Sequence, residues 1–302
     1  MAIFIGRDVA CMLLKTNHDI IYMIIIADSG ATKTDWRLVK DDGSLRSASC
    51  PGLNPSALNS EMINDIIGSV IPELNPEGKM IREIHFYGAG LVNEAAAAPL
   101  AAALELWCPF SQNNFHSDML AAARALFGNG SGIVAIMGTG SNSCLYRDGE
   151  IVKNIRPGGY VLGDEGSGMA LGKALLADFV KGLLPKDVEA DFVAESGLDY
   201  AGIVRRVYRE PAPSAFMASF APFVMSRLDE PYMRKLAEDC VESFVKRSLS
   251  RYESASGLPV GVVGSFGCAC EDMLHEIGGS YGLTFVRFLK SPIDELVKYH
   301  GI

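Results

Sequence analysis

The stretch that decides the fold is IIIADSGATKTDWR, residues 24–37. Three isoleucines lead into Asp28, and a run of small and polar residues separates them from Trp36, where the apolar pattern resumes. A β-branched apolar run followed by small polar residues predicts a buried strand that ends in a tight turn. Such a turn is either an ordinary hairpin connection or a binding site for an anion.

The residues after this turn extend the pattern into a meander. DWRLVK alternates, Asp42-Gly43 favours a second tight turn, and SLRSAS reads as a third strand, so residues 24–49 predict three antiparallel strands. The same plan returns at residues 133–155, IVAIMGTGSNSCLYRDGEIVKNI. An internal repeat of this size predicts two similar α/β lobes, each opening with a meander and continuing with helices and further strands.

The rest of the chain fits two lobes. Helices are expected at 61–71, 93–106, 118–127, 167–184 and 292–299, strands at 84–90 and 259–267, and mostly helix over 187–251, with interruptions at Pro211, Pro213, Pro222 and Pro231. We expect residues 1–22 to be an upstream extension that need not be native. We expect the N-terminal lobe to span 23–117, with residues 290–302 packing back on it, and the C-terminal lobe to span 118–289.

Composition excludes several classes of protein. The chain has 302 residues, 49% of them apolar, and a net charge of −9, which argues against a nucleic-acid or anionic-membrane surface. No apolar run approaches the ~20 residues of a membrane helix. Seven scattered cysteines without a CxxC pair fit reduced thiols and a cytoplasmic protein. Cys268 and Cys270 read as small buried residues rather than metal ligands.

The sequence lacks the familiar nucleotide-binding motifs. If the protein binds a nucleotide, a different kind of phosphate site must hold it. Neither Gly-Lys pair is followed by Ser or Thr, and no GxGxxG links a strand to a helix. Turns rich in Gly, Ser and Thr point successive backbone N–H groups one way and form an anion-binding concavity. Two such turns at repeat-related positions favour phosphate binding. Thr32, Thr34 and Thr139 add hydroxyl donors, Lys33 adds a cation, and Asp28 can hold Mg²⁺ directly or through water.

Four further stretches carry candidate chemistry. Asp118 opens a predicted helix, where it is either an N-cap, as Ser117 could also be, or a general base for an attacking hydroxyl. GGYVLGDEGSGMALG at 158–172 has more glycine than a turn needs and favours a loop that grips a hydroxylated ligand. GLNP at 52–55 is either a turn or a site where Asn54 meets sugar hydroxyls. VVGSFG at 262–267 is a strand-to-turn bend or a platform for adenine.

The ordered set DSGATKTD, SDMLAAARA, GTGSN, GDEGSG and VVGSFG resembles the BadF/BadG/BcrA/BcrD-type ATPase family of the actin/hexokinase/Hsp70 superfamily. Within it, the sequence is most similar to the N-acetylglucosamine kinases, over about residues 23–302. The resemblance implies an α/β fold of two ribonuclease-H-like (actin-like ATPase) lobes, related by internal duplication, with a nucleotide cleft between them.

The resemblance also implies residue roles. Asp118 is the implied catalytic base, and Asp28 the implied Mg²⁺ site. The implied ATP-binding set is Ser29, Gly30, Thr32, Lys33, Thr34, Gly138, Thr139, Gly140, Ser141, Gly264 and Ser265. The implied sugar-binding set is Asn54, Asp118, Thr139, Gly159, Tyr160 and Asp164. Tyr160 stands where the animal enzymes have tryptophan, in a loop two residues shorter, which leaves the identity of the sugar open.

The activity implied is transfer of a phosphoryl group from ATP to a hydroxyl, the 6-hydroxyl, of an amino sugar such as N-acetylglucosamine. Two rivals stay open. One is an ATPase that activates a dehydratase or reductase partner through an iron–sulfur cluster, and the other is a non-catalytic sugar-binding regulator. The expected partner is a small sugar, with no nucleic acid or membrane, and a homodimer is left open.

Overall fold

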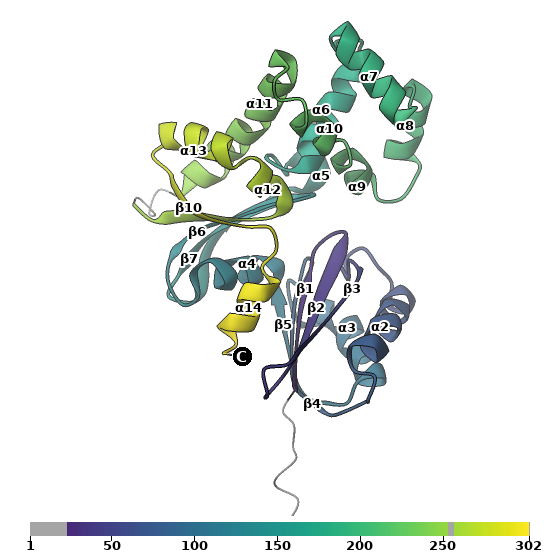
Figure 1. Ribbon diagram of the computed structural model, residues 1–302, viewed down its shortest axis with the longest axis vertical. Helices are drawn as coiled ribbons and strands as arrows, with labels where there is room; N and C mark the ends of the chain where they lie inside the picture. The colour runs from purple at the N-terminus through teal and green to yellow at the C-terminus, as the bar shows by residue number, and fades with distance from the viewer. Residues whose placement is uncertain (1–22, 253–256, 302) are drawn as a thin grey trace, which may run out of the picture.

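The computed structural model describes residues 23–252 and 257–301, and the predicted extension at 1–22 lies outside them. The chain forms two lobes, each built on a five-stranded sheet (Figure 1). This confirms the predicted α/β fold of two lobes. None of the described helices is long and apolar enough to cross a membrane.

The first lobe is a mixed sheet with the strand order β3-β2-β1-β4-β5. The first three strands form the predicted antiparallel meander, and β4 and β5 add to β1 in parallel. Its elements are β1 (Met23–Ser29), β2 (Lys33–Lys40), β3 (Leu45–Pro51), α2 (Ser60–Leu74), β4 (Ile81–Gly88), α3 (Glu94–Trp107) and β5 (Phe110–Ser117). Helices α2 and α3 cover one face, where Trp36 and Phe86 are fully buried in the core between sheet and helices.

The second lobe repeats this sheet with the order β10-β9-β6-β7-β8. Its strands are β6 (Gly132–Met137), β7 (Ser141–Arg147), β8 (Glu150–Ile155), β9 (Pro259–Val263) and β10 (Thr284–Leu289). β6, β7 and β8 form an antiparallel meander, and β9 and β10 extend it in parallel. The repeat predicted from residues 133–155 is therefore confirmed, strand for strand.

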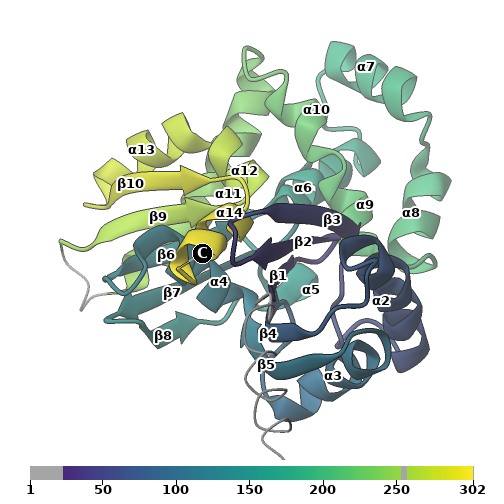
Figure 2. The ribbon, with the colours of Figure 1, turned by 60° about the horizontal axis from the view of Figure 1, so that its bottom comes forward.

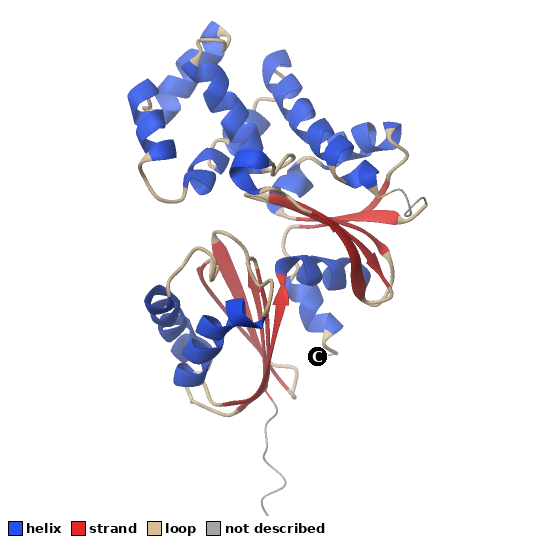
Figure 3. Ribbon diagram, turned by 180° about the vertical axis from the view of Figure 1, so that it is seen from behind, coloured by secondary structure: helices blue, strands red, loops and turns tan. Residues whose placement is uncertain are grey.

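Helices fill the long segment between β8 and β9 and follow β9 (Figure 3). They are α5 (Gly159–Leu162), α6 (Gly168–Val180), α7 (Lys186–Ser196), α8 (Tyr200–Tyr208), α9 (Pro213–Ala218), α10 (Ala221–Met225), α11 (Pro231–Arg247), the 3₁₀ turn η1 (Leu249–Arg251), α12 (Ser265–Ala269) and α13 (Glu271–Ser280). Pro213, Pro222 and Pro231 each stand in the first turn of a helix, where the missing N–H has no intrahelical partner to lose.

Two helices connect the lobes and pack on each other. α4 (Asp118–Phe127) follows β5 and leads into β6, and α14 (Ile293–Tyr299) follows β10. Figure 2 shows α14 between the two sheets, and it also contacts β1 and β2 of the first lobe. Ala121 and Ala125 of α4 meet Ile293 and Leu296 of α14 in a small buried cluster. The lobe boundary between 117 and 118 stays a prediction.

Candidate active site

A cleft of about 1150 Å³ lies between the lobes, where the strands of both sheets end. Most of the predicted site residues line it, although they come from opposite ends of the chain. They are Asp28, Gly30, Thr32, Lys33, Asn54, Asp118, Gly138, Thr139, Gly140, Ser141, Asp164, Gly264 and Ser265. Ser29, Thr34, Gly159 and Tyr160 are not among the lining residues.

The first turn joins β1 to β2 and is closed by the Gly30 N–H, which donates to the Lys33 carbonyl at 2.9 Å. The Lys33 ammonium lies 2.7 Å from Oδ1 of Asp35, and 60% of its side chain is exposed. An exposed ion pair of this kind is weak, so a bound phosphate can compete for the lysine. The turn thus offers the backbone donors and the cation that an anion needs.

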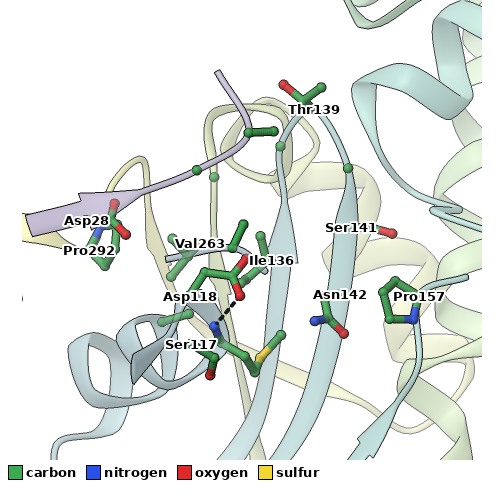
Figure 4. Close-up of a pocket in the computed structure, with 18 of the residues that line it drawn as sticks. Asp28, Ser117, Asp118, Ile136, Thr139, Ser141, Asn142, Pro157, Val263 and Pro292 are labelled. Carbon is green, nitrogen blue, oxygen red and sulfur yellow. Dashed lines mark hydrogen bonds between the residues drawn. The ribbon is translucent and has the colours of Figure 1, made fainter. Parts of the chain in front are cut away.

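The second turn joins β6 to β7 in the same way. The Gly138 N–H donates to the Gly140 carbonyl at 2.9 Å, and Thr139 stands at its tip (Figure 4). The loop before α6 braces this turn, because Gly168 N–H donates to the Gly138 carbonyl at 2.9 Å and Met169 N–H to the Thr139 carbonyl at 3.1 Å. The two turns occupy equivalent positions in the duplicated sheets and both line the cleft.

The sequence left open whether Asp118 is the N-cap of a helix or a general base, and the start of α4 shows which residue is the cap. Ser117 is the N-cap, since its hydroxyl accepts from the Leu120 N–H at 3.2 Å. Oδ1 of Asp118 accepts from the Met119 N–H at 2.9 Å, and the carboxylate points into the cleft (Figure 4). Burial raises the pKa of Asp118, against the opposing effect of the Met119 hydrogen bond. A raised pKa suits a carboxylate that accepts a proton from a hydroxyl.

Asp28 lies at the end of β1 in the same cleft. Burial, together with the negative charges of Asp118 and Asp35, raises its pKa to about 7. Burial makes the charged form of such a carboxyl costly, and a cation bound beside it offsets that cost. The donor chemistry of Asp28 therefore fits a hard divalent ion such as Mg²⁺.

Asp164 and Asn54 lie on the loops that follow β8 and β3. Asp164 has a left-handed backbone, with φ of 57°, and its carboxylate accepts from the Ser141 N–H. Burial raises its pKa, and the Ser141 hydrogen bond opposes that effect. Oδ1 of Asn54 accepts from the Ser56 N–H at 2.9 Å, and Asn54 lies so close to Gly90 that an added Cβ there would be 2.2 Å from Oδ1.

Gly264 directly follows β9 and has φ of 125°, a conformation open to glycine. A Cβ at this position would lie 2.2 Å from the Met137 carbonyl oxygen. The glycine therefore lets this turn approach the turn between β6 and β7 directly. The stretch 259–267, predicted as a strand that ends in a glycine-rich turn, begins with β9 as expected, but residues 265–269 form the short helix α12 rather than a turn alone.

The cleft also contains residues that the sequence reasoning did not single out. Asp35, Arg156 and Lys290 add charges, and the segment 89–92 after β4 adds part of a wall. The glycine-ended strand at 84–90 was a signal for that wall, since it matches the place of Gly264 in the second lobe. Arg156 lies two residues before the glycine-rich loop at 158–172 but belongs to no motif of its own.

Comparisons with known proteins identify the fold class and the family. The fold is that of actin-like ATPases, shared with a ROK family glucokinase from Streptomyces griseus in complex with glucose and AMPPNP, at TM-score 0.56 and 17% identity over 92% of this chain and 97% of that chain. The sequence model of the BadF/BadG/BcrA/BcrD ATPase family matches residues 27–240, and the chain belongs to this family.

Two solved structures match this chain with higher sequence identity and TM-score than the glucokinase does. A candidate N-acetylglucosamine kinase from Porphyromonas gingivalis matches at 38% identity and TM-score 0.85, over 92% of this chain and 98% of that chain. A second, from Chromobacterium violaceum, matches at 22% identity and TM-score 0.74, over 92% and 99%. A comparison with curated proteins returned no match.

Proposed function

We propose that the protein is an ATP-dependent sugar kinase that phosphorylates the 6-hydroxyl of an amino sugar, N-acetylglucosamine being the first candidate. The observation that carries the proposal is the position of Asp118. A carboxylate with a raised pKa faces a cleft that also contains two phosphate turns and the polar groups of Asn54 and Asp164. The 38% identity to the Porphyromonas gingivalis protein supports the choice of sugar class.

Each lobe supplies one phosphate turn and one sugar-side loop. The N–H groups of turns 30–33 and 138–141 would hold the phosphates of ATP, with Lys33 released from Asp35 to add a positive charge. Gly264 and Ser265 would lie under the adenosine. Asn54 and Asp164, which line the cleft, would orient the sugar, with Thr139 near both substrates. Gly159 and Tyr160 do not line the cleft in this structure and would reach the sugar only if their loop moved toward it. Positioning and electrostatics provide most of the catalysis of phosphoryl transfer.

Asp118 would act as the general base. Its Oδ1 is held by the Met119 N–H, which fixes the carboxylate and leaves the other oxygen for the sugar hydroxyl. As the hydroxyl oxygen bonds to the γ-phosphorus and the bond to the β–γ bridging oxygen breaks, the hydroxyl proton passes to Asp118. ADP and a sugar phosphate result. Asp28 would hold Mg²⁺, which neutralises charge on the phosphates when it is bound.

The rival role as an activator of a dehydratase needs thiols that can ligate a cluster at a subunit surface. Cys270 is 1% exposed and belongs to the core of the second lobe. Burial also raises its pKa to about 12, which disfavours the thiolate. The pair Cys268 and Cys270 therefore does not present two ligands at a surface.

A coupled assay of ADP release with Mg-ATP tests the proposal. The acceptor panel contains N-acetylglucosamine, N-acetylmannosamine, glucosamine, glucose and muramic-acid derivatives. We expect ADP release to depend on an N-acetylated amino sugar. ADP release at the same rate with and without every sugar would refute the kinase and support an ATPase.

A further inference from the structure

Two of the residues assigned to phosphate binding by sequence do not face the cleft. Ser29 and Thr34 flank the first phosphate turn, and both side chains are fully buried. Their hydroxyl oxygens lie 2.9 Å apart. The polar atoms of these side chains therefore need partners inside the protein, and those partners show what the hydroxyls do.

The partners belong to the loop that contains Asn54. The Leu53 N–H donates to the Ser29 hydroxyl at 2.9 Å and to the Thr34 hydroxyl at 3.2 Å. The Thr34 hydroxyl in turn donates to the Pro51 carbonyl at 3.1 Å. The ends of the first phosphate turn are thus bonded, through two buried hydroxyls, to the residue next to Asn54.

Steric contact joins the same two segments. A Cβ added to Gly52 would lie 2.5 Å from the Gly30 carbonyl oxygen and 2.8 Å from the Ala31 carbonyl. The loop therefore rests on the backbone of the phosphate turn with no side chain between them. Beyond it, Asn54 lies against Gly90, so turn, loop and cleft wall form one contiguous set of contacts.

The second lobe repeats this arrangement with different residues. The Ser141 hydroxyl donates to the Glu165 carbonyl at 2.6 Å, and the Ser141 N–H donates to the Asp164 carboxylate. Gly140 lies against Asp164, since a Cβ there would be 3.1 Å from Oδ2. In both lobes the phosphate turn is bonded to the loop that carries a predicted sugar contact.

From these contacts we propose that Thr34 and Ser29 in one lobe, and Ser141 in the other, are positioning residues that couple the nucleotide site to the sugar site. Phosphates that order a turn also order the loop bonded to it, so ATP and sugar bind more tightly together than apart. The sugar part of this inference rests on the proposed function, while the coupling of turn to loop does not. Coupling between two sites commonly changes affinity about 5- to 150-fold.

The test compares Thr34→Val, Thr34→Ser and Ser141→Ala with the wild type by hydrogen exchange, with and without Mg-AMPPNP. Ser143→Ala is the matched control, because it also removes a buried hydroxyl from a hydroxyl pair, with Tyr252 at 2.9 Å, and its hydrogen bonds reach neither phosphate turn. The segments followed are residues 52–58 and 163–169.

We expect AMPPNP to slow exchange in 52–58 at least about fivefold in the wild type, in Thr34→Ser and in the control, and less than about twofold in Thr34→Val. Ser141→Ala should lose the protection of 163–169 instead. The affinity for AMPPNP alone should change little in Thr34→Val. The ratio of the sugar dissociation constants without and with AMPPNP should fall toward one.

Two results would overturn the inference. One is equal protection of 52–58 in Thr34→Val and wild type. The other is a loss of AMPPNP affinity beyond about tenfold in Thr34→Val but not in Ser143→Ala, which would make Thr34 a phosphate ligand. A wild type that binds AMPPNP and protects both loops but phosphorylates no sugar would refute the proposed function and support the coupling. A wild type that binds no nucleotide would refute both.

Discussion

Oδ1 of Asp118 accepts a hydrogen bond from the Met119 N–H at 2.9 Å, while the neighbouring Ser117 caps the same helix. The helix start therefore does not depend on Asp118 as its cap, and the carboxylate faces the cleft with a raised pKa. This separation makes the two residues a matched pair for mutation.

Asp118→Asn should lower kcat by roughly 10²-fold or more, because the amide cannot take the proton of the attacking hydroxyl. The amide oxygen can still accept from Met119, so Tm should change little. Ser117→Ala should do the opposite, lowering stability by about 1 kcal/mol through loss of the cap while kcat falls far less. Steady-state kinetics and thermal melts of both variants check this. A large Tm loss with unchanged kcat in Asp118→Asn would make Asp118 a structural residue.

The raised pKa of Asp28 should make the free energy of unfolding depend on pH. Its pKa is raised to about 7 in the folded protein, so the folded state binds a proton that the unfolded state loses above its pKa of 3.8. Ionisation of Asp28 therefore costs the folded state increasing stability from about pH 4 up to about pH 7, and the full cost remains above.

Asp28→Asn removes that cost. Without nucleotide, its stability relative to wild type should rise between pH 5 and pH 8 by roughly 2 kcal/mol, from ~1.4 kcal/mol per pKa unit and with partial solvent access allowed for. Denaturant melts at the two pH values measure it. Asp65→Asn, at an exposed position on α2, is the control and should show no such rise. A constant difference between Asp28→Asn and wild type would contradict the raised pKa.

Gly52→Ala should weaken nucleotide binding. The new methyl would lie 2.5 Å from the Gly30 carbonyl oxygen and 2.8 Å from the Ala31 carbonyl, and these backbone atoms cannot rotate away as a flexible side chain could. The turn must shift, so we expect at least about a tenfold loss of AMPPNP affinity. Calorimetry measures it against Gly279→Ala, where an added Cβ meets nothing within 4 Å. Equal affinities in the two variants would show that the loop is not packed on the turn.

A buried histidine at the junction of the lobes, His300, should make the folded protein less stable at acidic pH. Arg124 Nη1 donates to the Tyr87 hydroxyl at 2.7 Å, so the hydroxyl proton is free to donate to Nε2 of His300 at 2.9 Å. Burial, with the nearby His85 and Arg124, lowers the pKa of His300 to about 3. Neutral His300 is thus part of the packing between α4, α14 and β4.

The unfolded chain takes up a proton at His300 below about pH 6.5, and the folded chain does not until far lower pH. Stability from this residue is therefore complete above pH 6.5 and falls as the pH is lowered, by roughly 1–2 kcal/mol between pH 7 and pH 5. His300→Gln, which keeps an acceptor for Tyr87, should flatten this fall, whereas the exposed His275→Gln should not. Denaturant melts between pH 7 and pH 5 measure the free energy of unfolding of both proteins. If this free energy falls equally with pH in His300→Gln and in the wild type, His300 is not the residue responsible.

Local patterns predicted most of the framework. The alternation around Trp36, Asp42-Gly43 and the repeat at 133–155 depend on strand and turn chemistry that neighbouring residues determine, and the structure contains both meanders. β5 was not predicted, because it is an edge strand with no fully buried residue and its sequence, FSQNNFHS, lacks an apolar face. α13 was also not predicted.

The site was harder to predict than the fold. Motifs indicated which turns reach the cleft, but not which way a side chain points within a turn. Ser29 and Thr34 have the same chemistry as Thr32, but the alternation of β1 and β2 places both on the face that buries Ala27 and Trp36. The loop at 51–53, which is distant from Ser29 in the sequence, then closes over them. Tyr160 is likewise outside the lining of the cleft in this structure. Long-range packing of this kind cannot be derived from local sequence.

A ³¹P NMR time course with wild-type protein, Mg-ATP and N-acetylglucosamine tests the proposed phosphoryl transfer directly. We expect a phosphomonoester resonance, coupled to the two protons of a methylene group, that grows in step with ADP and is absent without sugar. Inorganic phosphate growing at the same rate with and without sugar, and no phosphomonoester, would contradict it.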